Sequence, residues 1–242
     1  MPPNGSINSP KLDSLISNAI EGTFKRLEKA FIDDTIEWNW IEFWDTPGLL
    51  SIILSDKANR VFNHYGKDSF TREEFCSEFC LPFKIFYDKF LPEAPMSELE
   101  LLYTKFFNQS HENVFLLPGA KEILRECSNL GIKTYLLSSI KKQHFESQSA
   151  ELGLSDFFDI AYTEALDKRD WITRLLKDNN ISHEHTVFIG DMKHDIETAR
   201  YAEVFSVGVL TGYNSKEMIE GSNPDLIVND LVELLEIIIN KS

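Results

Sequence analysis

Apolar residues follow two different spacings along this chain, and the two spacings alternate through its second half. Short continuous apolar runs are typical of buried strands, whereas apolar residues at every third or fourth position indicate amphipathic helices. The runs predict strands at 132–138, 158–162, 186–190, 205–209 and 225–228. The helical spacing predicts helices near 119–130, 141–152, 169–179, 195–202 and 230–240. This alternation predicts an α/β fold, with a parallel sheet covered by helices on both faces.

The first half of the chain has a different pattern. Residues 1–10 are rich in Pro, Gly, Ser and Asn, and we expect a disordered leader there. Residues 11–31 repeat apolar positions at helical spacing, and the first core strand is predicted at 36–40. The apolar face of this leader helix must cover something. We favour the flank of the core, and the alternative is a partner subunit in an oligomer.

The segment from 49 to 115 is rich in aromatic residues, and its spacing is helical throughout. The helices expected there are 49–65, 71–80, 83–90 and 97–107. Packing between these helices is the default interpretation of the aromatic residues. The chain is thus divided into a leader (1–10), an N-terminal helix with the first strand (11–48), a helical insert (49–115) and a core (116–242).

Composition narrows the function classes. The net charge of -15 argues against nucleic acid and against anionic membranes as partners, because both attract Lys and Arg. No apolar run reaches the ~18 residues of a membrane span, and the N-terminus does not read as a signal peptide. Cys76, Cys80 and Cys127 are expected to be reduced thiols. These features predict a cytoplasmic protein.

The most informative stretch runs from Val187 to Asp195. Its apolar run ends in glycine and is followed by Asp191, with Asp195 four positions later. A buried strand would place Asp191 at its own carboxyl end, and Asp195 would lie on the first turn of the next helix. Carboxylates that converge at such an edge suit Mg²⁺, which prefers oxygen ligands. The alternative is a strand-to-helix turn in which Asp caps the helix. His194, between the two acids, is interpreted as an exposed helix residue.

Together with other motifs, this stretch resembles the haloacid dehalogenase (HAD) superfamily, and within it the phosphoglycolate-phosphatase-like subgroup with a helical cap. The family has a Ser or Thr after an apolar strand, and Ser138 and Ser139 follow such a strand here. It also has a lysine at the place of Lys168, and the paired acids match Asp191 and Asp195. The resemblance implies a HAD-like Rossmannoid core with 49–115 as a small cap. It further implies that Ser138, Ser139 and Lys168 bind phosphate and that Asp191 and Asp195 bind the metal.

The first catalytic motif of that family is absent. Members begin with Asp-x-Asp, which supplies the nucleophile and the general acid, whereas this chain has Trp38-Asn39-Trp40 before the matching tail that ends at Pro47. With one residue deleted, Asn39 occupies the nucleophile position; without the deletion, Trp38 does. A rival register uses Phe31 and Asp33, but the leader helix competes for those residues. No register leaves an aspartate nucleophile.

Three functions remain open. The first is a catalytically impaired phosphatase homologue that binds a phosphorylated small molecule or a protein partner, with weak Mg²⁺ binding. The second is an active Mg²⁺-dependent hydrolase in which Glu37, Glu42 or Asp45 replaces the missing carboxylate. The third is a structural or assembly subunit that makes its contact through the leader helix.

Overall fold

One parallel sheet organises the part of the chain that the structure describes. The computed structural model describes residues 39–42, 49–108 and 116–239. Within them, six strands pair in the order β3-β2-β1-β4-β5-β6. The strands are β1 Asn39–Glu42, β2 Lys133–Leu137, β3 Ile160–Tyr162, β4 Thr186–Gly190, β5 Phe205–Val209 and β6 Leu226–Val228. All five pairings are parallel, so the carboxyl ends of the strands lie at one edge of the sheet.

Helices cover both faces of this sheet, as the alternating pattern predicted. They are α6 Ala120–Asn129, α7 Lys142–Leu152, α8 Lys168–Asp178, α9 Lys193–Tyr201, α10 Lys216–Gly221 and α11 Leu231–Ile239, with a short 3₁₀ turn at His183–His185. Alternation along β4 explains the two layers. Val187 and Ile189 pack with residues of α6 and α11. Phe188 points to the opposite face and packs with α8 and α9. The protein is therefore an α/β fold with a two-sided core.

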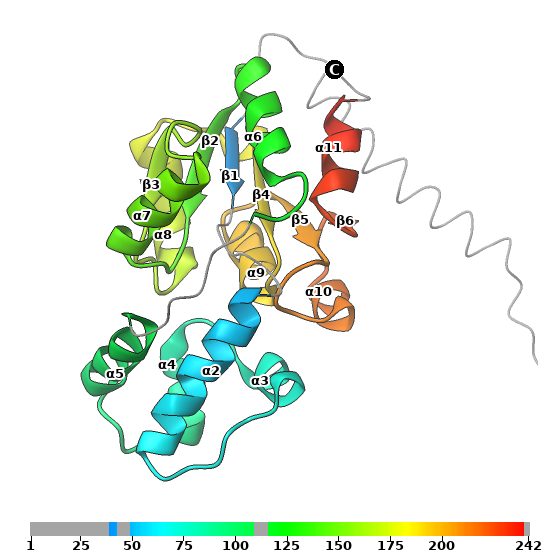
Figure 1. Ribbon diagram of the computed structural model, residues 1–242. Helices are drawn as coiled ribbons and strands as arrows, with labels where there is room; N and C mark the ends of the chain where they lie inside the picture. The colour runs from blue at the N-terminus through cyan, green and yellow to red at the C-terminus, as the bar shows by residue number, and fades with distance from the viewer. Residues whose placement is uncertain (1–38, 43–48, 109–115, 240–242) are drawn as a thin grey trace, which may run out of the picture.

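Four helices form a separate layer at the carboxyl edge of the sheet, in the lower part of Figure 1, toward which the β1 arrow points. They are α2 Leu49–His64, α3 Arg72–Glu78, α4 Phe83–Phe90 and α5 Met96–Asn108. We call them the cap. Its interior is one cluster of buried apolar and aromatic side chains, into which Met192 and Tyr213 of the core also pack. The cap thus rests on the loops that follow β4 and β5.

Element boundaries mostly agree with the sequence pattern, with two differences. The first strand, described as Asn39–Glu42, extends two residues beyond the predicted end at residue 40, and residues 36–38 lie outside the described part of the chain. The short helix α10 was not predicted, because its six residues are too few to show a periodic pattern. The expected leader, the leader helix and the rival strand near residue 31 lie outside the described residues. In the described part of the chain, no helix is long and apolar enough to cross a membrane.

Candidate functional site

Two polar residues stand level with each other at the carboxyl edge, on either side of β1. Leu136 of β2 and Ile189 of β4 both pair with Glu42. Ser138 and Asp191 each come two residues later, directly beyond the last residue of their strands. Because neighbouring strands are ~4.8 Å apart, two such strand ends lie roughly 10 Å from each other. The two residues therefore lie on either side of the end of β1.

A buried ion pair lies beside this edge. Lys168 Nζ donates to Asp195 Oδ1 at 2.6 Å, and both side chains are 0% exposed. The other oxygen of Asp195 accepts from the backbone N–H of Met192 at 3.0 Å, which caps the start of α9. Gly190 leaves room for this carboxylate, since a Cβ there would lie 2.3 Å from Asp195 Cβ. Lys168, expected to bind phosphate, therefore neutralises Asp195 in this structure.

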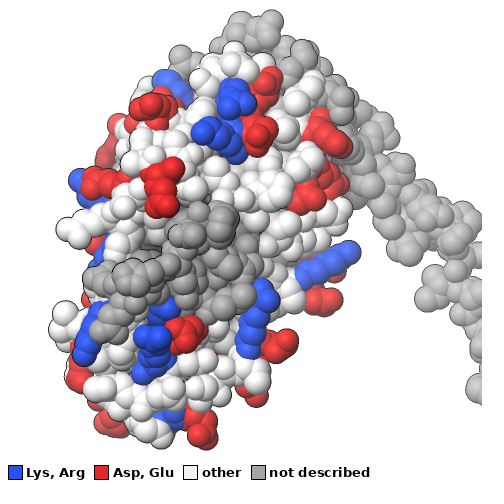
Figure 2. Space-filling view, viewed as in Figure 1, with Lys and Arg blue, Asp and Glu red and all other residues white. Residues whose placement is uncertain are grey.

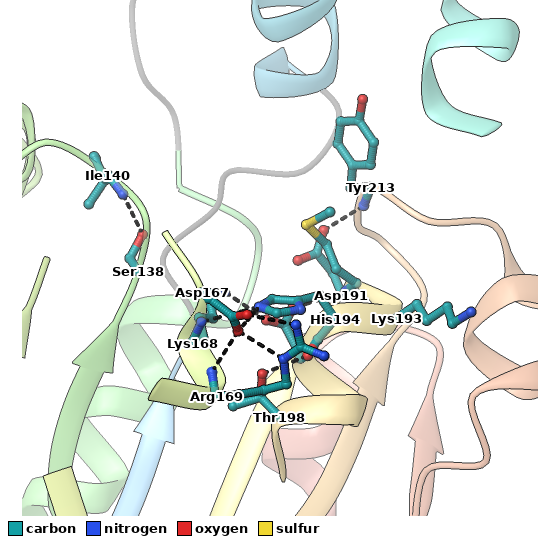
Figure 3. A network of polar contacts seen from close by, with 12 residues as sticks. Ser138, Ile140, Asp167, Lys168, Arg169, Asp191, Lys193, His194, Thr198 and Tyr213 are labelled. Carbon is teal, nitrogen blue, oxygen red and sulfur yellow. Dashed lines mark hydrogen bonds and ion pairs between the residues drawn. The ribbon is translucent and has the colours of Figure 1, made fainter. Parts of the chain in front are cut away.

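Asp191 has a different environment from Asp195. Its Oδ2 accepts from the backbone N–H of Tyr213, as Figure 3 shows, whereas Oδ1 is buried and has no hydrogen-bond partner. Burial, reinforced by the nearby charge of Asp195, raises the pKa of Asp191 to about 7. A buried carboxylate oxygen without a partner is costly, and either a proton or a cation would satisfy it. Of the two acids, Asp191 therefore has the free oxygen that a metal needs.

The start of α8 is fixed by a third buried group, His194. Its Nε2 accepts from the backbone N–H of Lys168 at 3.2 Å, and the side chain is 4% exposed. Burial lowers the pKa of His194, which keeps the ring neutral and able to accept this bond. The interpretation of His194 as an exposed helix residue was therefore wrong. Sequence periodicity does not predict this burial, because which face of α9 is buried depends on how α8 packs against it.

The two serines differ in their surroundings. Ser138 is 1% exposed, and its Oγ accepts from the backbone N–H of Ile140 at 3.1 Å. Ser139 is half-buried and lines a cavity between the core and the cap. The family resemblance implies that both serines bind phosphate. The structure places Ser138 at the sheet edge and Ser139 on the cavity wall.

The strand register does not agree with placing Asn39 at the nucleophile position. Asn39 pairs with Lys133 and Thr186, each five residues before Ser138 and Asp191 respectively. At ~3.3 Å per residue, Asn39 lies roughly 16 Å from the carboxyl edge along the strand direction. Glu42, the last residue of β1, is nearer to that edge. Of the other carboxylates considered as substitutes, Glu37 and Asp45 lie outside the described residues.

The face of the protein in Figure 2 carries both acidic and basic side chains. Figure 2 shows acidic and basic side chains interspersed on the face in view, with no continuous basic area among the coloured residues. A nucleic-acid surface would gather Lys and Arg on one face. The face in view therefore gives no support for a nucleic-acid partner.

Comparison with known proteins identifies the family. The sequence pattern described as "Haloacid dehalogenase-like hydrolase" matches residues 51–209. The match begins beyond β1, so it does not include the altered first motif. The chain belongs to the haloacid dehalogenase-like hydrolase family.

The curated proteins similar to this chain include phosphoglycolate phosphatases. A phosphoglycolate phosphatase of Vibrio parahaemolyticus is 29% identical over 143 residues, which is 57% of this chain and 63% of that protein. The phosphoglycolate phosphatase of Photobacterium profundum is 24% identical over 204 residues, covering 76% of this chain and 88% of the relative. The matched part of the chain thus spans somewhat under two thirds of the first relative.

Solved structures of other proteins superpose on the fold of this chain. A haloacid dehalogenase-like hydrolase from Streptococcus pneumoniae superposes with a TM-score of 0.70 at 20% identity, covering 83% of this chain and 97% of the other. CbbY from Rhodobacter sphaeroides, solved in complex with phosphate, gives a TM-score of 0.69 at 16% identity, with 82% and 96% covered. At these identities the likeness shows the fold alone.

Phosphatases of this family generally use Mg²⁺, and the described residues fit such an ion in one respect. The unpartnered Oδ1 of Asp191 is an oxygen of the type that Mg²⁺ prefers. Asp195 is less suited to bind a metal ion, because both its carboxylate oxygens already accept hydrogen bonds. Within the described ranges, no three His, Cys, Asp or Glu side chains form a metal-binding group. A Mg²⁺ ion that keeps several waters needs only one or two protein carboxylates.

Proposed function

We propose that this protein binds a phosphorylated ligand at the carboxyl edge of the sheet and turns phosphate esters over far more slowly than an intact family member. One observation carries the proposal. Ser138 and Asp191 stand level on either side of β1, while the sequence around β1 contains no Asp-x-Asp. This arrangement supports a phosphate-binding edge that lacks the nucleophile of the family. The relatives named phosphoglycolate phosphatase support a phosphorylated small molecule as ligand.

Binding would use groups that are already in position. The hydroxyl groups of Ser138 and Ser139 and the first backbone N–H groups of α7 would hold phosphate oxygens. No side chain caps α7, so none competes for those N–H groups. Asp191 would hold Mg²⁺, which, when bound, offsets the negative charge of the phosphate. The Lys168–Asp195 pair would keep Asp195 from repelling the ligand, because its charge is compensated within the protein.

Turnover would be slow because the covalent route needs an ionisable oxygen. A carboxylate can attack phosphorus and form an aspartyl phosphate. The sequence around β1 contains no Asp-x-Asp to supply this carboxylate together with a general acid. Loss of the general acid removes a further ~10²–10⁴ in rate. Ligand binding depends on the other edge residues, so it is expected to survive this loss.

Calorimetry on the full chain tests this proposal. We expect inorganic phosphate to bind in the presence of Mg²⁺ and to bind at least tenfold more weakly to Asp191→Asn. Asp170→Asn is the matched control, because Asp170 is an exposed acid in the first turn of α8. Absence of phosphate binding by the unmodified chain, or equal binding by the two variants, would contradict the proposal.

A second candidate is an active hydrolase with a substitute carboxylate. The register favours it over any role for Asn39, because Glu42 ends β1 only two positions short of the level of Asp191. Asp45 follows shortly in the sequence. Single alanine replacements of Glu37, Glu42 and Asp45 would identify the attacking group. If the unmodified chain turns over phosphate esters, the loss of that activity in one variant assigns the role.

Association with another protein is the third candidate. The apolar spacing of residues 11–31 predicts a helix with one face to cover, either on this chain or in an oligomer. Light scattering of the full chain and of a variant without residues 1–31 tests this. A change from oligomer to monomer supports a structural or assembly role through that segment. We also propose a cytoplasmic location, which imaging of a tagged chain would check.

A further inference from the structure

The cavity between the core and the cap lies next to the proposed phosphate site. Its volume is about 130 Å³. Since one water needs ~10–15 Å³ by this measure, the cavity has room for roughly ten non-hydrogen atoms. On the core side the wall includes Ser139, Met192 and Tyr213. Met192 follows Asp191 in the sequence, and the backbone N–H of Tyr213 donates a hydrogen bond to Asp191. A ligand whose phosphate lies at the edge would therefore extend its other end into this cavity.

The wall of the cavity is mainly apolar. The cap contributes aromatic and aliphatic side chains from α4, α5 and the turn before α4, among them Phe79, Phe83, Leu99 and Tyr103. The core adds Leu166, which is 43% exposed although it is a large apolar residue. Exposed apolar surface beside a concave site is typical of ligand contact. The part of the ligand that enters here therefore has a mainly carbon surface.

The wall contains a buried polar atom that has no hydrogen-bond partner among the described residues. Gln148, on α7, lines the cavity, and its Oε1 is buried without a hydrogen bond. A buried acceptor of this kind costs free energy until a donor reaches it. Small-molecule sites commonly combine apolar walls with a few such polar groups, which fix the orientation of the ligand. A hydroxyl or amino group on the ligand would satisfy this oxygen.

The charges in the wall disfavour an acid. Glu100 on α5 is a lining residue, and it would repel a carboxylate. Lys141 is a lining residue too, but it already pairs with Glu164 at 3.7 Å. Burial, followed by the charge of Lys141, lowers the pKa of His144, so this ring is mainly neutral at pH 7. A short phosphate ester that ends in a carboxylate, such as phosphoglycolate, would therefore place that carboxylate against apolar side chains and near the negative charge of Glu100.

Resting on the proposed function, we infer that the ligand is a phosphate monoester of a mainly apolar alcohol, with one hydrogen-bond donor that reaches Gln148. Each methylene buried in the cavity should then tighten binding about fourfold. The gain should stop once the cavity is full, which fixes a length limit. A carboxylate at the same place should bind no better than inorganic phosphate.

The test is calorimetry of the full chain in Mg²⁺ with inorganic phosphate, with ethyl, butyl and hexyl phosphate, and with phosphoglycolate. Butanol and hexanol are included without phosphate. We expect affinity to rise from phosphate to hexyl phosphate and phosphoglycolate to bind no more tightly than phosphate. If phosphate binds but the alkyl series is flat, or phosphoglycolate binds most tightly, this inference fails and the proposed function stands. If neither phosphate nor any ester binds, both fail. Equal binding of hexanol and hexyl phosphate would also overturn the inference.

Two variants place the apolar group in this cavity. Leu166→Gln should lower the affinity for hexyl phosphate at least fivefold and leave inorganic phosphate unchanged. Leu130→Gln is the control, because Leu130 is similarly exposed, at 41%, and does not line the cavity. Gln148→Leu should tighten the binding of hexyl phosphate. The same variant should bind 6-hydroxyhexyl phosphate more weakly than it binds hexyl phosphate. Equal effects of the two leucine variants, or no effect of Gln148→Leu on either ester, would place the ligand elsewhere.

Discussion

The cap and the carboxyl edge of the core are buried to similar degrees but by different chemistry. In the cap, Phe86 is 1% exposed, and its ring centroid lies 5.3–5.7 Å from those of four other phenylalanines. At the edge, Lys168, Asp191, His194 and Asp195 are all at most 4% exposed. The cap is filled by packed aromatic rings, whereas the edge buries titratable groups that are held by an ion pair and hydrogen bonds. This difference suggests that the core supplies phosphate chemistry and the cap selects what is attached to the phosphate.

The largest effect on stability is expected where a charge loses its partner. Lys168→Met leaves the buried carboxylate of Asp195 uncompensated, and we expect a loss of about 3–5 kcal/mol in the free energy of unfolding. Urea denaturation measures it. The control is Lys84→Met, which removes an exposed ion pair with Asp88 and should cost less than ~0.5 kcal/mol. Similar losses in both variants would mean that the edge is not organised by this pair.

A comparable loss is expected in the cap when one ring is removed. Phe86→Ala empties the centre of the aromatic cluster, and such truncations cost about 3–5 kcal/mol. Ile85→Ala on the same helix is the control, since Ile85 is 55% exposed and its truncation should cost within ~0.5 kcal/mol. The two regions are then distinguished by function. Phe86→Ala should weaken hexyl phosphate binding more than phosphate binding, and the opposite order would contradict the division of roles.

The pH dependence of stability should report Asp191. Its pKa in the folded protein is raised from 3.8 to about 7, so the folded state binds the proton more tightly than the unfolded state. The stabilisation is fully present below the unfolded pKa and is lost as the pH rises through about 7. Asp191→Asn should therefore narrow the difference in unfolding free energy between pH 5 and pH 8. An unchanged difference would show that Asp191 does not titrate in this range.

A smaller effect is expected from the glycine that makes room for Asp195. Gly190→Ala would place a Cβ 2.3 Å from Asp195 Cβ and force the carboxylate away from Lys168. Overpacking of this kind costs about 1–3 kcal/mol. Gly221→Ala is the control, because a Cβ there meets nothing within 4 Å. A thermal or urea unfolding comparison of the two variants decides the matter, and equal stability would contradict the close packing at this edge.

Much of the fold could be predicted from periodicity alone. The strand at 205–209 and the helix at 83–90 have the expected boundaries, because each is a continuous apolar run or a clear amphipathic repeat. The end of the first strand was predicted two residues early, since the aromatic residues around Asn39 fit a strand at several positions. Only pairing with β2 and β4 decides among them.

The site was predicted less completely than the fold. Asp191 and Asp195 were predicted as metal ligands from their spacing. Their different environments depend on tertiary contacts, which the spacing does not reveal. Lys168 comes from 27 residues away to pair with Asp195, and the backbone of Tyr213 comes from 22 residues away to reach Asp191. His194 has no sequence signal, because its burial depends on the packing of α8 against α9. Gln148 was missed because a glutamine on an amphipathic helix normally faces solvent.

The central claim is that phosphate binding is retained while phosphate-ester turnover is impaired. Steady-state hydrolysis of a generic aryl phosphate by the full chain, with and without Mg²⁺, tests it most directly. We predict turnover far below the ~1–10³ per second of ordinary enzymes, under conditions where calorimetry detects phosphate binding. Turnover within that range, abolished by Asp191→Asn and retained by Asp170→Asn, would contradict the claim.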